Sequence, residues 1–310
     1  MNVPSWLWFA TIGGLVAVIV ADLLVVGRVP HAVTLRETTR WVLCYVGLAV
    51  LFGLGVWLLA GGRAGGEFFA GYVTEYSLSL DNLFVFAVIM SSLAVPAANQ
   101  HRVLLFGIVI ALVLRGAFIA VGAAAVARFT WVFFLFAAVL LYTAVNLIRQ
   151  GLGDDEEWRE GRFLRLVRRV LPVTPMMLVM LAIGTTDLLF ALDSIPAIFG
   201  LTREPYLVFT ANAFALMGLR QLYFLLGGLL RRLVYLSYGL AVILAFIGVK
   251  MVLHALHENS LPFLNGGRPV PVPEVGIGLS LGVITGVLAV TTVASLLAAR
   301  RAGARVTSGG

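Results

Sequence analysis

The chain has 310 residues, of which 61% are hydrophobic and 12% are charged, and its mean hydropathy of +1.01 excludes a water-soluble globular domain. Its apolar runs are continuous, which excludes a membrane β-barrel, whose strands alternate apolar and polar residues. The net charge of +7 comes from short connections between these runs and not from one basic face, so nucleic acid is excluded as a partner.

Nine apolar runs are long enough to cross a bilayer, which takes about 20 residues per helix. In chain order they cover residues 5–27, 39–60, 68–94, 103–127, 130–149, 176–200, 205–227, 233–256 and 275–298. We therefore expect an all-α polytopic membrane protein with about nine transmembrane helices.

The runs and their connections divide the chain into six expected segments. These are two N-terminal transmembrane helices in 1–66, a first three-helix unit in 67–149, a cytoplasmic linker in 150–175, a second three-helix unit in 176–257, an external loop in 258–274, and the last transmembrane helix with a cytoplasmic tail in 275–310. Within the linker, apolar residues recur at helical spacing from Phe163 to Val170. We expect an amphipathic helix on the lipid headgroups there, and a regulatory or partner-docking segment is the alternative.

Arginines are distributed unequally between the two sides of the predicted membrane. The connections after the first, third, fifth, seventh and ninth runs hold fifteen arginines, whereas the other connections hold four. The positive-inside rule then places the N-terminus outside and the C-terminus in the cytoplasm, in a multi-pass protein of the inner (plasma) membrane. The lipid bilayer is accordingly an expected partner.

Charged residues within the apolar runs are the most informative feature, because each costs about 2.5–3.5 kcal/mol at the centre of a bilayer. Seven such residues are present: Glu75, Asp81, Arg115, Asp187, Asp193, Arg220 and Lys250. The four acids outnumber the three bases by one, so mutual pairing leaves one negative charge for a cation or a proton to neutralise. We expect the acids to form an ion site and the three bases to balance charge.

Four of these charges belong to two matching motifs, TEYSLSLDNLFVFA from Thr74 and TTDLLFALDSIPAIF from Thr185. Each motif has an acid, an aspartate six residues later and then a small polar residue. Since the orientation above makes the two runs antiparallel, the motifs predict two inverted three-helix repeats with a site near the midplane between them. Pro196 supports a site there, because it cannot donate a hydrogen bond to the carbonyl of Leu192.

Helix geometry leaves one question open within the first motif. At about 100° per residue, Asn82 shares a helix face with Glu75, whereas Asp81 points about 120° away. Asp81 and Asp193 can therefore reach one site only if their helices are distorted there, and otherwise each faces a neighbouring helix.

The paired motifs resemble the TerC family of integral membrane proteins, which is named for tellurite resistance and grouped with the LysE-type exporters. The resemblance covers roughly residues 70–260 and implies export of manganese(II) from the cytoplasm, with an association with tellurite resistance in some members. It also implies that six residues line the metal site: Glu75, Asp81, Asn82, Asp187, Asp193 and Ser194. Asn146 departs from the family pattern, in which we expect a lysine like Lys250.

We therefore expect a secondary transporter that exports manganese(II) by proton antiport through a carboxylate site between inverted repeats. Oxygen ligands suit manganese, magnesium and calcium alike, so the choice of manganese and the direction of transport come from the resemblance. Neither a permanently bound cofactor nor enzyme activity is expected, because the chain has no nucleotide-binding, serine-triad or zincin motif. The expected partners are manganese(II) and protons, while homo-oligomerisation and a cytoplasmic partner stay open.

Two other classes of function also stay open. One is a membrane scaffold of a tellurite or stress-resistance complex, which would recruit cytoplasmic partners through residues 150–175. The other is an intramembrane enzyme that uses the same aspartates. A scaffold would tolerate the loss of Glu75 or Asp81 but not of the linker, whereas a transporter would show the opposite.

A pair of reporter fusions tests the predicted orientation. Because of the arginine distribution, we expect a fluorescent protein at the C-terminus to fluoresce in the cytoplasm, and an enzymatic reporter at Gly267 to be active outside. A C-terminus outside the cell would contradict the inverted repeat as well, because it would change the number of crossings.

Overall fold

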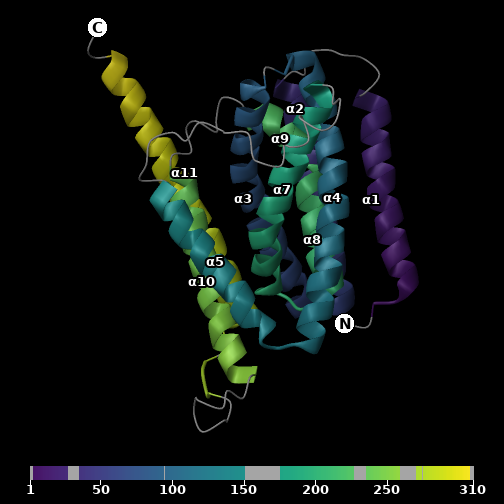
Figure 1. Cartoon of the computed structure of the whole chain (residues 1–310), viewed down its shortest axis with the longest axis vertical. Coiled ribbons are helices and arrows are strands. Elements are labelled where there is room, and N and C mark those ends of the chain that lie inside the picture. The colour runs from purple at the N-terminus through teal and green to yellow at the C-terminus, as the bar shows by residue number, and fades with distance from the viewer. Residues whose placement is uncertain are drawn as a thin grey trace.

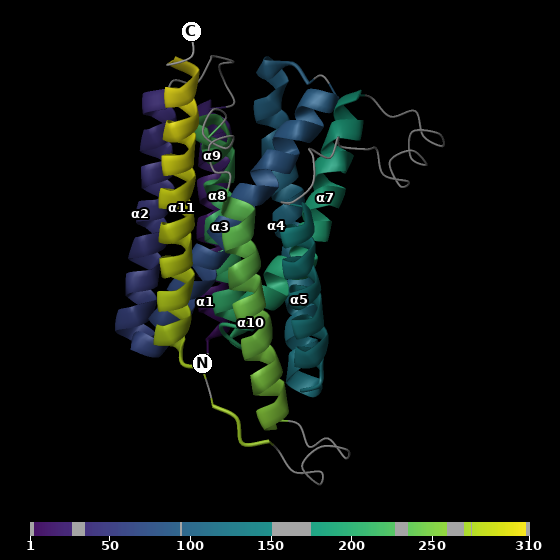
Figure 2. The ribbon, with the colours of Figure 1, turned by 90° about the vertical axis from the view of Figure 1, so that its left-hand side faces the viewer.

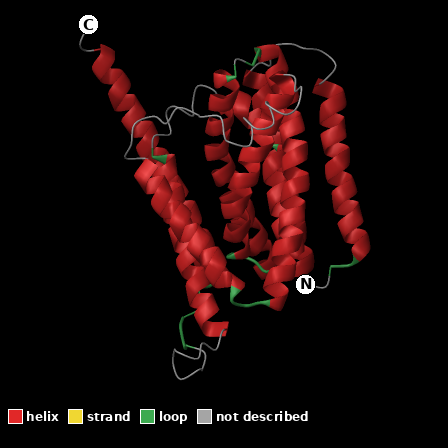
Figure 3. Cartoon of the chain, viewed as in Figure 1, coloured by secondary structure: helices red, strands yellow, loops and turns green. Residues whose placement is uncertain are grey.

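The computed structural model describes residues 3–26, 35–93, 95–150, 175–226, 235–258, 270–273 and 275–307, and the regular elements among them are all α-helices (Figures 1 and 3). They are α1 (Ser5–Val26), α2 (Leu35–Ala60), α3 (Gly62–Ser92), α4 (Ala97–Arg128), α5 (Val132–Gln150), α7 (Pro175–Phe199), α8 (Pro205–Met217), α9 (Leu219–Leu226), α10 (Leu236–Glu258) and α11 (Ile277–Thr307). Apolar runs form helices because a bilayer requires each backbone N–H and C=O to be paired within its own segment. The predicted all-α class is confirmed for the described part of the chain.

Seven helices among the described residues are long and apolar enough to cross a membrane: Arg36–Ala60, Gly62–Ser91, Val103–Arg128, Val132–Arg149, Met176–Phe199, Leu236–Glu258 and Ile277–Ala299. The predicted spans 5–27 and 205–227 fall on shorter apolar helices, Ser5–Ala21 and Pro205–Met217. Seven of the nine expected spans are thus supported by both length and composition.

The run 205–227 is divided because its first helix stops at Met217. Gly218 directs its N–H back to the carbonyl of Leu216, and α9 then begins at Leu219. By contrast, α7 continues through Pro196 to Phe199, since a proline removes one hydrogen bond without having to end the helix. The helical run is therefore interrupted at Gly218, after α8, and not at Pro196 in α7.

Helix α3 lies in the middle of the bundle, where it contacts α2, α7, α8 and α11. Around it, α4 packs against α7 and α8, and α5 packs along α10 (Figures 1 and 2). Buried residues make up 62% of the most apolar window of α3 but only 11% of that of α11. The core is therefore built around the helix that carries the first sequence motif.

Two apolar clusters lie one above the other within the group formed by α3, α4, α7 and α8. In the view of Figure 1, the upper cluster joins the end of α3 to the starts of α4 and α7, and it includes Leu83, Ala111, Ile183, Leu216 and Leu219. The lower cluster joins the second halves of α4 and α7 to the start of α8, and it includes Ile119, Ala191, Ile198, Phe199 and Val208. Arg115 of α4 and Asp187 of α7 each lie along their helix between a residue of the upper cluster and a residue of the lower cluster.

Two predicted segments fall largely outside the described residues. Of the linker 150–175 only Gln150 and Pro175 are described, so the amphipathic helix predicted between Phe163 and Val170 lies outside them, as does most of the loop 258–274. The start of α7 lies at the same end of the bundle as the end of α11, whereas the N-terminus lies at the other end (Figure 1).

Candidate functional site

Arg115 has the largest fully buried side chain among the described residues, and it lies near the middle of α4. One helical turn before it, Ala111 belongs to the upper cluster, and one turn after it, Ile119 belongs to the lower cluster. A guanidinium keeps its charge in proteins, so burial at this depth costs several kcal/mol unless acids surround it.

The guanidinium of Arg115 pairs with the acids that begin both sequence motifs. Its Nε donates to Asp187 Oδ2 and its Nη2 donates to Asp187 Oδ1, each at 3.1 Å. Its Nη1 pairs with Glu75 Oε1 and also donates to Ser194 Oγ at 3.3 Å. One arginine thereby joins α3 to α7, in the two-pronged geometry that suits carboxylates. We call Glu75, Arg115, Asp187 and Ser194 the polar layer.

The polar layer joins two carboxyl groups to one guanidinium, so its formal charge is negative when both acids are ionised. Glu75 is fully buried and Asp187 is 1% exposed, so solvent does little to screen this charge. Glu75 Oε2 and the hydroxyls of Thr74 and Ser79 have no hydrogen-bond partner within the described part of the chain. Buried oxygens are seldom left unpaired, and these are suited to bind a cation or a proton.

The remaining predicted ligands lie on the same two helices. Asn82 is buried on α3, seven residues after Glu75 and on the same helix face. Asp193 is half-buried on α7, next to Ser194, whereas the side chain of Asp81 is outside the described residues. Among the described side chains, no three His, Cys, Asp or Glu residues gather into a metal-binding group. Glu75, Asp187 and Ser194 are therefore the predicted ligands that the structure brings together.

The three predicted charge-balancing bases have different surroundings. Arg115 pairs with both motif acids, as described above. Lys250 on α10 instead donates to Ser280 Oγ on α11 at 3.1 Å, and Ser280 Oγ donates to the carbonyl of Gly276 at 3.1 Å. The side chain of Arg220 lies outside the described residues.

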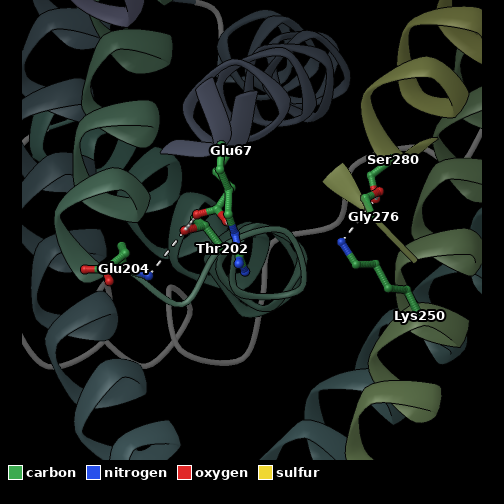
Figure 4. Close-up of polar contacts among 7 residues, drawn as sticks. Glu67, Thr202, Glu204, Lys250, Gly276 and Ser280 are labelled. Carbon is green, nitrogen blue, oxygen red and sulfur yellow. Dashed lines mark hydrogen bonds and ion pairs between the residues drawn. The ribbon is translucent and has the colours of Figure 1, made fainter. Parts of the chain in front are cut away.

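Sequence reasoning missed one buried carboxylate, Glu67, in the second turn of α3. It is 8% exposed, its Oε1 accepts a hydrogen bond from Arg63 Nε at 2.9 Å, and its Oε2 accepts one from Thr202 Oγ1 at 2.6 Å (Figure 4). The predicted run 68–94 begins one residue later, so Glu67 was not among the charges identified within the apolar runs. A run extended by one helical turn would have included it.

Arg63, Glu67 and Thr202 form a second polar cluster at the start of α3. Thr202 belongs to the connection between α7 and α8, where its Oγ1 also accepts the backbone N–H of Glu204 at 3.2 Å (Figure 4). Lys250 lies within electrostatic range of Glu67. The cluster ties the start of α3 to the α7–α8 connection, at the end of the bundle that the arginine distribution predicts to be external.

Comparison with known proteins gives a consistent family assignment. The profile of the integral membrane protein TerC family matches residues 60–303. An uncharacterized membrane protein of Mycobacterium tuberculosis is 49% identical over 322 residues, which cover 97% of this chain and 81% of the relative. The putative membrane-bound redox modulator Alx of Escherichia coli is 38% identical over 315 residues, which cover 92% of each chain. No solved structure matches.

Replacing Arg115 tests the charge balance of the polar layer. Arg115→Met leaves two buried carboxylates without a counter-charge, so we expect a loss of about 3–5 kcal/mol in stability, seen as a lower melting temperature in detergent. Adding Glu75→Gln removes one carboxylate and should recover part of the loss. As a control, Arg203→Met breaks a half-exposed ion pair with Glu258 and should cost about 0–1 kcal/mol. A double variant that melts no higher than Arg115→Met would contradict the assigned balance.

Proposed function

Because this chain belongs to the TerC family of integral membrane proteins, we propose that it is a secondary transporter that exports manganese(II) from the cytoplasm in exchange for protons. The proposal places the chain in the inner membrane, with its N-terminus outside and its C-terminus in the cytoplasm. Manganese(II) and protons are its cargo, and the proposal assigns it no resident cofactor and no catalysed reaction.

The observation that carries this proposal is that two carboxyl groups meet one guanidinium in the polar layer. Asp187 uses both of its oxygens to hold Arg115, so its role is to fix the guanidinium in place. Glu75 uses only Oε1 for that purpose and keeps Oε2 unpaired within the described residues. Glu75 is therefore the acid of this layer that is best suited to exchange a proton for a cation.

Helix packing supports two inverted repeats as the frame of the site. The first helix of each proposed repeat packs against the middle helix of the other, α3 on α8 and α7 on α4, while the third helices, α5 and α10, pack together. In addition, α3 and α7 run in opposite directions (Figure 1). A pseudo-two-fold axis in the membrane plane would produce such reciprocal contacts, and transporters built this way bind their cargo between the repeats.

The proposed cation shell consists of oxygen ligands: Glu75, Asp81 and Asn82 on α3, and Asp193 and Ser194 on α7. Such ligands favour hard or borderline divalent ions, and the family resemblance selects manganese(II) among them. The E. coli relatives are described as putative redox modulators. In this chain the single cysteine, Cys44, is exposed, so intrachain thiol–disulfide exchange is not open to it.

Proton exchange provides the energy for export in this mechanism. Moving a divalent cation outward against an inside-negative potential costs about 4.6 kcal/mol per 100 mV, and two protons moving inward would cancel that electrical cost. Burial favours the protonated form of a carboxylate, whereas a bound cation favours its ionised form. In the proposed cycle Asp81 and Asp193, together with Glu75, alternate between these two forms.

Manganese content measured in an exporter-deficient bacterial host tests the proposed function. We expect the wild-type chain to lower cellular manganese and restore manganese resistance. Single changes Glu75→Gln, Asp81→Ala or Asp193→Asn should abolish both because each removes a proposed ligand, and Asp187→Asn should do so because it loosens the hold on Arg115. As a matched control, Glu258→Gln removes a carboxylate from the half-exposed pair with Arg203 and should retain export.

Protein levels on immunoblots must stay near wild type for this result to count. Full resistance in both Asp187→Asn and Asp193→Asn would remove α7 from the proposed site. If instead the carboxylate variants all work and deletion of residues 151–174 abolishes resistance, the scaffold alternative would replace the transporter.

Coupling to protons is tested with purified protein in liposomes that carry a pH-sensitive dye. An imposed pH gradient should drive manganese against its own concentration gradient, and manganese movement should shift the lumenal pH, because the carboxylates exchange one cargo for the other. Manganese movement that neither responds to the pH gradient nor changes the lumenal pH would rule out antiport.

A further inference from the structure

Asn212 on α8 is a buried amide that has no hydrogen-bond partner in the described part of the chain. The residue is 1% exposed, and both Oδ1 and Nδ2 are unpaired. An amide at such a depth is normally satisfied on both atoms. By contrast, Thr210 on the same helix donates its hydroxyl to the carbonyl of Tyr206 at 2.8 Å, as buried helix hydroxyls commonly do. The Asn212 amide makes no such hydrogen bond within its own helix, so it is suited to bind a ligand.

Asn212 lies at the same level of the bundle as the polar layer. One turn before it, Val208 belongs to the lower cluster, and one turn after it, Leu216 belongs to the upper cluster. Asp187 has the same setting on α7, where Ala191 belongs to the lower cluster and Ile183 to the upper one. Arg115 has it on α4, as described above. Arg115, Asp187 and Asn212 are thus buried polar residues that each lie one turn from a residue of the upper cluster and one turn from a residue of the lower cluster.

At this level α8 also approaches the helices that carry Arg115 and Glu75. A methyl group placed on Gly116 of α4 would lie 3.6 Å from the Phe209 ring, and one placed on Gly71 of α3 would lie 3.3 Å from Ala211 Cβ. Gly116 follows Arg115 directly, and Gly71 is one turn before Glu75. Asn212 follows Ala211, so it lies in the stretch of α8 that contacts both helices.

We propose that Asn212 is a further ligand of the transported cation. Its amide oxygen coordinates the divalent ion together with Glu75 Oε2, and its N–H steadies a carboxylate of the polar layer. Amide and carboxylate oxygens are a common pair of ligands for hard divalent ions. The inference rests on the proposed function and adds α8 to a site that sequence reasoning confined to α3 and α7.

The variant Asn212→Leu distinguishes a role of this residue in cation binding from a role in the packing of α8. Asn212→Leu keeps the number and branching of the side-chain heavy atoms and removes an unpaired buried amide, so the melting temperature in detergent should stay the same or rise. In liposomes with an imposed pH gradient, the manganese concentration for half-maximal transport should rise at least about tenfold, the order of loss seen when a residue of a metal site is changed. Added manganese should also stabilise this variant against heat less than it stabilises the wild type.

Two further variants serve as controls in the same assay. Thr210→Val removes a hydroxyl that is satisfied within its own helix, and should transport manganese like the wild type. Asn212→Asp keeps an oxygen ligand, and should show half-maximal transport nearer to the wild-type concentration than Asn212→Leu does.

The outcomes distinguish this inference from the proposed function. A wild-type protein that moves no divalent cation would overturn the proposed function itself. A wild-type protein that transports manganese, with Asn212→Leu equal to it, would overturn only the role of Asn212. Equal impairment of Asn212→Leu and Thr210→Val would do the same, because it would trace the loss to the packing of α8.

Discussion

The cost of holding a guanidinium in the middle of the bundle constrains the rest of this structure. Arg115 keeps its charge, so acids must reach it from more than one helix, and those helices must approach closely. Small residues permit that approach: a methyl group on Gly107 of α4 would lie 2.9 Å from Ile183 Cγ2, and one on Gly184 of α7 would lie 3.3 Å from Ile110 Cγ2. Close contact of α4 and α7 is thus the packing that lets Asp187 meet Arg115 with both oxygens.

The two buried glutamates of α3 differ in how many of their oxygens accept hydrogen bonds. Glu67 accepts hydrogen bonds on both oxygens, from Arg63 and Thr202, and so resembles a tie between segments. Glu75 accepts on one oxygen only, in a more deeply buried position. An unpaired carboxylate oxygen in a low-dielectric interior is costly, which supports the binding role proposed for Glu75.

From the sequence, the helical class and the acids that meet at Arg115 could be predicted better than the buried amide of α8 and the break between α8 and α9. Helical class and the meeting of Glu75 with Asp187 followed from the penalty for charge in a bilayer, which leaves few arrangements. The proposed ligand Asn212 was not predicted because a neutral amide barely changes the hydropathy of its run, and its unpaired state depends on neighbours from other helices. The interruption at Gly218 was missed because glycine is common within membrane helices, whereas Pro196 drew attention and left α7 intact.

The interruption at Gly218 determines where the helical segments of the second half of the bundle end. Its 13 residues make α8 about 20 Å long, shorter than the roughly 30 Å of a bilayer's hydrocarbon core, so α8 ends at membrane depth. The residue that joins α8 to α9 has no side chain, and its N–H bonds back to Leu216. Gly218 therefore divides this part of the bundle into two helical segments, α8 with Asn212 and α9 with Leu219 and Leu222 of the upper cluster.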